Sequence, residues 1–96
     1  MPISYRAAQN LIKRGDVEGL SEALAQKIDP NAKNPNGWTL LMLAAVEGNV
    51  ALAELILDRG ASTNNKNAKG ETALSIASAR GHEEFVNFLK SRGASA

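Results

Sequence analysis

Cysteine is absent from the 96 residues of this chain. A disulfide framework, a thiolate zinc site and a cysteine nucleophile are therefore excluded. Aromatic residues make up only 4%, so the core has to be built mainly from alanine and leucine. No apolar run approaches the roughly 20 residues of a membrane span, and the N-terminus lacks the apolar segment of a signal peptide. These absences predict a cytoplasmic protein with no membrane partner.

An excess of charge of one sign is also absent. The chain has 11 Lys and Arg against 10 Asp and Glu, a net charge of +1. This balance excludes a strongly basic protein that binds nucleic acid by bulk charge. Hydrophobic residues reach 44%, enough for a folded core, and 96 residues leave room for one domain. We expect a single domain over residues 1–96.

The chain repeats itself at an offset of 33 residues without a gap. Glycines recur at this offset in three separate registers: Gly15, Gly48 and Gly81; Gly37 and Gly70; Gly60 and Gly93. A fixed period of this length is typical of stacked repeat proteins. We place repeat 1 at about 4–36 as an N-terminal cap, repeat 2 at about 37–69, and repeat 3 at about 70–96 as a truncated C-terminal cap.

Each repeat has the same internal layout, which is clearest in repeat 2. Thr39 is a good N-cap for a short helix over 40–47, and Gly48 suits its C-terminus. A second helix is predicted from about 50 to 58 and is ended by Gly60. The polar stretch that follows, rich in Asn and Lys, predicts an extended turn or hairpin, here called a finger.

Neither predicted helix is long enough to be stable alone, because isolated helices are marginal below about 12–15 residues. The repeats must therefore hold one another by packing. Small side chains on the first helices allow close approach between neighbouring repeats: Ala44, Ala45, Ala77, Ser78 and Ala79.

The motifs of these units resemble the ankyrin repeat. In repeat 2 the resemblance rests on N-P-N-G-W-T-L-L-M at 34–42, Ala-Ala at 44–45, Gly-Asn at 48–49 and Gly-Ala at 60–61. In repeat 3 it rests on N-A-K-G-E-T-A-L-S at 67–75, Gly-His at 81–82 and Gly-Ala at 93–94. The resemblance implies an all-α solenoid of stacked helix-turn-helix units with hairpin-like finger loops.

Two positions depart from the family pattern in both repeats. Leu40 and Ala73 stand where the family has proline, and Met42 and Ser75 stand where it has histidine. We therefore expect the family's histidine–threonine hydrogen bonds between repeats to be missing. The expected consequence is lower stability than a consensus array, with the same fold.

The two ends carry polar residues at positions that are apolar in repeat 2. Glu22 takes the position of Leu55, Lys90 that of Leu57, and Ser78 that of Ala45. Because terminal repeats need a polar outer face, this pattern predicts a complete, capped and monomeric unit. The apolar segment 85–88 leaves a second interpretation open, in which the C-terminal end dimerises or packs on another unit.

Residues for catalysis are few. His82 is the single histidine, and its place after Gly81 favours a capping or packing role. Metal sites need three or four ligands, and the adjacent Glu83 and Glu84 diverge by about 100° on a helix. No serine motif or phosphate-binding loop is present. We predict a protein that is not an enzyme and has no cofactor or metal.

The resemblance implies that partners bind the concave face, which the fingers and first helices form. The period places these candidate contact residues there: Tyr5, Lys13, Arg14, Lys33, Asn36, Trp38, Val46, Glu47, Lys66, Lys69, Glu71 and Arg80. Trp38, the single tryptophan, is the predicted anchor, because tryptophan is enriched at binding hot spots. Glu71 takes the same position one repeat later and indicates that this position faces solvent. The alternative is that Trp38 lies flat over the finger or over Tyr5.

Charge differs between the two sides of the predicted solenoid. The concave set has six basic residues (Lys13, Arg14, Lys33, Lys66, Lys69, Arg80) and two acidic ones (Glu47, Glu71). The second-helix side has seven acidic residues (Asp16, Glu18, Glu22, Glu54, Asp58, Glu83, Glu84) and four basic ones (Lys27, Arg59, Lys90, Arg92). Such a field would steer an acidic partner to the concave face. The alternative is that these lysines are simply solvated.

These features predict a protein–protein interaction module, a scaffold or adaptor that binds an acidic or mixed protein surface. Trp38 would be the anchor, with Tyr5, Lys33, Lys66 and Lys69 around it. Two alternatives remain. The basic residues and two aromatics would also suit a polyanion such as RNA or a phosphorylated ligand, although nucleic acid is disfavoured by the small number of cations. The chain would otherwise be a structural segment that joins a larger assembly through residues 85–88.

Overall fold

The computed structural model describes residues 4–26 and 28–94. These residues form six helices: α1 (Tyr5–Arg14), α2 (Val17–Ala25), α3 (Leu40–Glu47), α4 (Val50–Asp58), α5 (Ala73–Ala79) and α6 (Glu83–Ser91). Within the described part there is no β-strand, only an isolated bridge between Lys33 and Thr39. The predicted all-α class is confirmed, and the bounds of α3 and α4 coincide with the two helices predicted for repeat 2.

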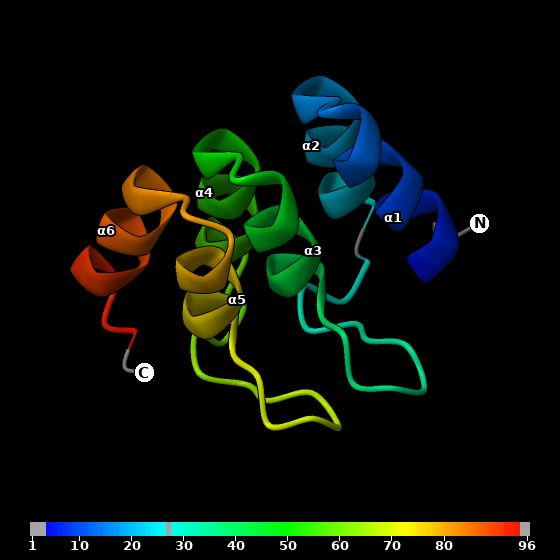
Figure 1. Cartoon of the computed structure of the whole chain (residues 1–96). Coiled ribbons are helices and arrows are strands. Elements are labelled where there is room, and N and C mark those ends of the chain that lie inside the picture. The colour runs from blue at the N-terminus through cyan, green and yellow to red at the C-terminus, as the bar shows by residue number, and fades with distance from the viewer. Residues whose placement is uncertain (1–3, 27, 95–96) are drawn as a thin grey trace.

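The helices stack as three antiparallel pairs in two layers (Figure 1). The first helices contact one another in the order α1, α3, α5, and the second helices in the order α2, α4, α6. The fingers, finger 1 (28–38) and finger 2 (61–71), project together from one end of the helix pairs. The predicted solenoid is therefore present, with the first helices and fingers on one side and the second helices on the other.

The first helices α3 and α5 begin with reciprocal caps. The hydroxyl oxygen of Thr39 accepts the Met42 N–H at 3.3 Å, and that of Thr72 accepts the Ser75 N–H at 3.1 Å. In return the Thr39 N–H donates to the Met42 sulfur at 3.5 Å, and the Thr72 N–H donates to Ser75 Oγ at 2.9 Å. Met42 and Ser75 thus close the first turn of their own helix, as in a capping box.

Small residues line the contacts between the first helices. Ala44, Ala45 and Ala77 have no exposed surface, as predicted for residues that let neighbouring helices approach. Ser78 and Ala79 are exposed, so for them the prediction is wrong. The reason is that they lie on the side of α5 that no other described helix covers.

One asparagine organises the tip of each finger. Asn34 Oδ1 accepts the N–H groups of Asn36 (2.9 Å) and Trp38 (3.0 Å), and Asn67 Oδ1 accepts those of Lys69 (2.9 Å) and Glu71 (3.0 Å). The two fingers are also joined, because the Ala68 N–H donates to the Asn36 carbonyl at 2.9 Å. The fingers are therefore ordered, hairpin-like turns that hold their surface residues in fixed positions.

The two asparagines differ in burial, which gives a prediction. Asn67 is only 7% exposed, and its Nδ2 also donates to Glu71 Oε1 at 2.9 Å, whereas Asn34 is half-buried. Asn67→Ala removes a buried side chain that makes three hydrogen bonds, two to backbone N–H groups and one to Glu71, so it should lower the free energy of unfolding by about 2 kcal/mol. Asn34→Ala should cost about 1 kcal/mol, because Asn34 is only half-buried and makes two such hydrogen bonds. Urea unfolding followed by circular dichroism measures both, and equal losses would contradict the role of burial.

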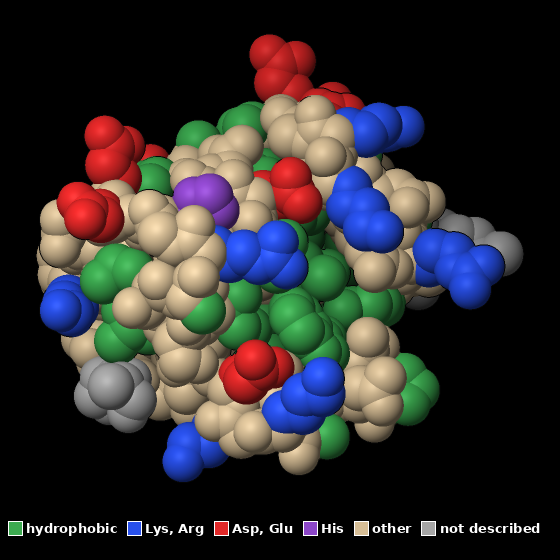
Figure 2. All heavy atoms as spheres, in the orientation of Figure 1, with side chains coloured by type: hydrophobic (Ala, Val, Ile, Leu, Met, Phe, Trp, Pro, Cys, Tyr) green, Lys and Arg blue, Asp and Glu red, His purple; other side chains and the backbone are tan. Residues whose placement is uncertain are grey.

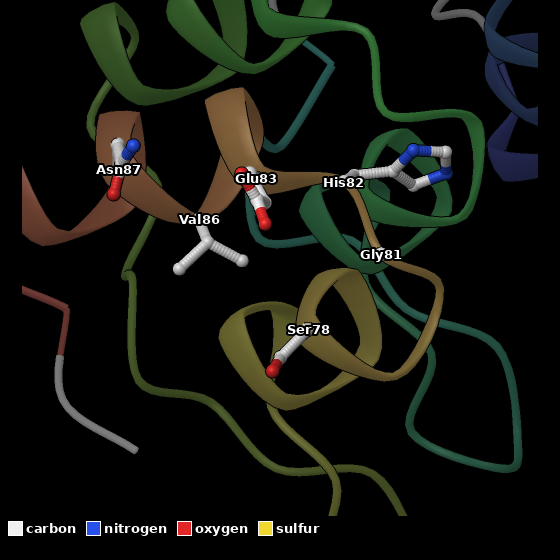
Figure 3. Close-up of a pocket in the computed structure, with 6 residues that line it drawn as sticks. All are labelled: Ser78, Gly81, His82, Glu83, Val86 and Asn87. Carbon is white, nitrogen blue, oxygen red and sulfur yellow. The ribbon is translucent and has the colours of Figure 1, made fainter.

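His82 connects repeats 2 and 3. It precedes α6, but its side chain makes no cap hydrogen bond; instead Nε2 lies 3.0 Å from the Val46 carbonyl oxygen. The ring sits over Gly48, where an added Cβ would lie 2.6 Å from its atoms. In Figure 3 the ring points away from Ser78 and Val86. The predicted packing role of the single histidine is confirmed, and the hydrogen bond to repeat 2 is a feature that the sequence did not indicate.

Candidate functional site

The concave face has an apolar centre (Figure 2). Helix α3 contacts α1, α5 and α4, so only one of its sides is left uncovered. Its residues that are not buried, Leu43, Val46 and Glu47, are spaced at i, i+3 and i+4 and therefore share that side. Leu43 and Val46 are half-buried and pack against the core from this side.

Tyr5 and Trp38 add two aromatic rings, at equivalent positions of repeats 1 and 2. Both are half-buried and pack against the core. Trp38 ends finger 1, and its backbone N–H is held by Asn34. Tyr5 opens α1; its hydroxyl has no hydrogen-bond partner among the described residues, and burial raises the pKa of the phenol above 10.0. We call Tyr5, Trp38, Leu43 and Val46 the apolar patch.

Leu43 was missed by reasoning from the sequence. Its spacing from Val46 was the available signal, because residues three apart on a helix share a side. The period was misleading, since the equivalent position in repeat 3 is Ile76, which is 5% exposed. The partial burial of Trp38 agrees in part with each of its two interpretations, and its role as an anchor stays a prediction.

All six predicted cations of the concave face are exposed: Lys13, Arg14, Lys33, Lys66, Lys69 and Arg80. Three of them also serve the ends of first helices, with Lys13 and Arg14 in the last turn of α1 and Arg80 as the C-cap of α5. Cations are favourable there because the C-terminal end of a helix is partly negative. Arg14 is further drawn to Asp16, at 3.8 Å.

The finger lysines have no such structural role. Lys33, Lys66 and Lys69 lie far from any helix C-terminus in the sequence, and none forms an ion pair within residues 4–26 and 28–94. Asn36, beside them, is exposed at the tip of finger 1. No contact within the described residues therefore explains the positive charge of the finger lysines. Either a partner or solvent meets these three side chains.

The two acids of the concave face differ from each other. Glu47 is exposed at the end of α3. Glu71 is half-buried, and its carboxylate accepts a hydrogen bond from Asn67, so it supports finger 2. The position that Glu71 shares with Trp38 is thus only partly solvent-facing. Glu47 is therefore the exposed acid that a partner on this face would contact.

On the second-helix side, several acids serve the beginnings of helices. Asp16 caps α2, with its Oδ1 accepting the Gly19 N–H at 2.8 Å, and Glu18, Glu83 and Glu84 lie in first turns. Asp58 pairs with Arg92 at 3.0 Å. Lys27, predicted on this side, lies outside the described residues. The charge difference between the two sides therefore arises partly from helix polarity.

The described residues contain neither a metal-binding cluster nor a membrane-spanning helix. Within the described residues, no group of three or more His, Asp or Glu side chains comes together in a way that could hold a metal ion. None of the described helices has the length and apolar character that crossing a membrane requires.

The fold and surface together define a short repeat solenoid of helix pairs and fingers. The family model for ankyrin repeats, in three copies, matches residues 5–96, and the chain therefore belongs to the ankyrin-repeat family. Repeats of this family generally act as protein-interaction modules and are typically not enzymes.

Two solved structures are similar to this chain. The human ASB11 ankyrin repeat domain is 30% identical, with a TM-score of 0.87, over 93% of this chain and 40% of that one. A chain in the structure of the predatory endopeptidase Bd0816 from Bdellovibrio bacteriovorus in complex with the immunity protein Bd3460 is 31% identical, with a TM-score of 0.89, over 97% of this chain and 49% of that one. This chain thus spans less than half the length of either.

Proposed function

We propose that this chain is a non-enzymatic module whose concave face binds a partner protein with an acidic surface. One observation carries the proposal: the half-buried apolar patch and the six exposed cations all come from the first helices, their C-terminal ends and the fingers. Binding sites between proteins have this composition, with an apolar, aromatic-rich centre and a polar rim. The structure with the immunity protein supports a protein partner, since a chain in that complex shares this fold.

Trp38 is the anchor in this proposal. The side chain of Asn34 accepts hydrogen bonds from the N–H groups of Asn36 and Trp38, so the backbone at Trp38 is ordered before binding. Little backbone freedom is therefore lost when a partner covers the indole. The finger lysines attract an acidic partner and raise its association rate more than its final affinity.

The first test is a cross-linked capture from a lysate of the source cell, with three folded proteins side by side. They are the wild type, the concave variant Trp38→Ala/Lys66→Ala/Lys69→Ala, and a control with three exposed second-helix acids changed, Glu18→Ala/Glu54→Ala/Glu84→Ala. We expect a protein that the wild type and the control recover and the concave variant loses. Equal recovery by all three would contradict the proposed face.

Trp38→Ala alone gives the quantitative prediction, once the captured partner is purified. Truncating a central aromatic anchor should weaken binding by at least about thirtyfold, the equivalent of about 2 kcal/mol. Lys66→Ala should lower the association rate several-fold and leave the dissociation rate nearly unchanged. Isothermal titration and surface plasmon resonance measure these quantities. A folded Trp38→Ala protein with full affinity would remove the anchor assignment.

The alternative, binding of a polyanion, depends on the same cations. The salt dependence of the binding affinity distinguishes it from binding of a protein. RNA or phosphorylated ligands would lose affinity steeply between 50 and 200 mM salt, because phosphate contacts release counterions. The apolar patch favours a protein instead, since half of its members are aliphatic and do not stack on bases. A homopolymer RNA that binds tightly at low salt and is released at 200 mM would support the alternative.

A further inference from the structure

The C-terminal end of the solenoid has a hollow of about 410 Å³ between α5 and α6. Its lining residues are Leu74, Ser75, Ser78, Ala79, Val86 and Lys90. One period earlier, five of the six equivalent positions are buried at 7% exposure or less, and the sixth is half-buried: Leu41, Met42, Ala45, Ala53 and Leu57, with Val46. In repeat 2 these positions are covered because repeat 3 follows. The hollow is therefore a copy of the interface that joins repeats, and no described residue covers it.

This surface, the α5–α6 face, keeps only part of the chemistry of a repeat interface. Leu74, Ala79 and Val86 are still apolar, whereas Lys90 stands where repeat 2 has Leu57. A lysine buried as deeply as Leu57 would be costly without a partner charge. A molecule that covers this face is therefore favoured if it brings an acidic group to Lys90.

A second hollow of about 240 Å³ continues the face toward the beginning of α6 (Figure 3). It shares Ser78 and Val86 with the first hollow and adds Gly81, His82, Glu83 and Asn87. Glu83, Val86 and Lys90 are spaced at i, i+3 and i+7, so they form one row along α6. The row begins with an exposed acid, has a half-buried valine at its middle and ends with an exposed base.

This row is complementary to itself. When a second α6 lies antiparallel against the first, with a two-fold axis between positions 86 and 87, Glu83 of each copy faces Lys90 of the other. The acidic group that favours covering Lys90 is thus supplied by the same chain. Ser75, Ser78 and Ala79 on α5 are small and allow the second copy to approach closely.

We propose that the α5–α6 face binds a second copy of this chain in a two-fold symmetric dimer, held by Val86 at the centre and by two Glu83–Lys90 ion pairs. The interaction is isologous, so it closes at two copies. It leaves both concave faces free and makes the module bivalent for its partner. The face is small, since α5 and α6 span seven and nine residues, and small interfaces are typical of weak complexes. A dissociation constant on the order of 0.1 mM is expected.

The experiment is sedimentation equilibrium of the purified chain from 10 μM to 1 mM at low salt. The wild type should change from monomer to dimer over this range. Lys90→Glu and Glu83→Lys should each weaken self-association by at least about tenfold, because each reversal changes two symmetry-related contacts. Mixing these two variants should restore a dimer, since the mixed pair has both attractive contacts. Glu84→Lys, an equal charge reversal beside the row, should change the dissociation constant by less than about threefold.

Circular dichroism confirms that each variant is folded, so a lost dimer is not mistaken for unfolding. A wild-type mass that stays monomeric to 1 mM would overturn the proposal. Growth beyond a dimer would also overturn it, because it would indicate head-to-tail stacking. The proposed ion pairs are equally contradicted if the mixed variants fail to dimerise, or if Glu84→Lys weakens the dimer as much as Glu83→Lys does.

Discussion

Gly48→Ala should lower the free energy of unfolding by about 3 kcal/mol. Gly48 has a φ of 68°, which costs a residue with a Cβ about 1–2 kcal/mol. The added Cβ would also meet the ring of His82 at 2.6 Å, so the ring has to move and its hydrogen bond to the Val46 carbonyl is lost. Losing that bond adds about 1 kcal/mol. Urea unfolding, monitored by circular dichroism, measures the change.

Gly15 provides a matched control, because it ends α1 with the same φ of 68°. Its added Cβ would meet only Asn49 Nδ2, at an ordinary 3.7 Å. Gly15→Ala should therefore cost about 1–2 kcal/mol, from the backbone alone. In a His82→Ala background, Gly48→Ala should fall to the same value. Equal losses for Gly15→Ala and Gly48→Ala in the wild-type background would show that the histidine contact contributes nothing.

Phe85→Ala should cost about 4 kcal/mol, the largest effect we expect from a single truncation. Phe85 has no exposed surface and is the largest of the fully buried side chains, so its removal leaves a cavity in the core. The loss is comparable to a large part of the whole stability of a small domain, which is roughly 5–15 kcal/mol. Phe85 belongs to repeat 3. Because each repeat of a solenoid contacts only its neighbours, the loss is concentrated in repeat 3, which should unfold first.

Hydrogen exchange measures the order in which the repeats of Phe85→Ala unfold. The amides of α5 and α6 should lose protection before those of α3 and α4. Phe88→Ala is the control. Phe88 is the same residue type on the same helix, but it is half-exposed, with Arg92 5.6 Å from its ring centre. We expect a loss of about 1 kcal/mol there. Comparable losses at positions 85 and 88 would contradict the burial argument.

Local signals explain why helices α3 and α4 were predicted with their correct bounds. A threonine that caps the first turn and a glycine with positive φ act within a few residues, so they can be recognised in the sequence. The candidate site was predicted less completely. Leu43 was missed because its partial exposure depends on how α1, α4 and α5 surround α3. Glu71 was predicted to face solvent, whereas a hydrogen bond to Asn67 draws it into finger 2.

By itself, the sequence determined the family, the three-repeat solenoid and the absence of cysteine chemistry, because period and composition are properties of the chain alone. Only the tertiary structure decided which of the periodic positions are covered. Ala45 is buried and Ser78, one period later, is exposed, because α5 packs against α3, whereas no further first helix among the described residues packs against α5. His82 shows the same limit. Its partner lies 36 residues away, and a contact over that distance exists only once the repeats have stacked.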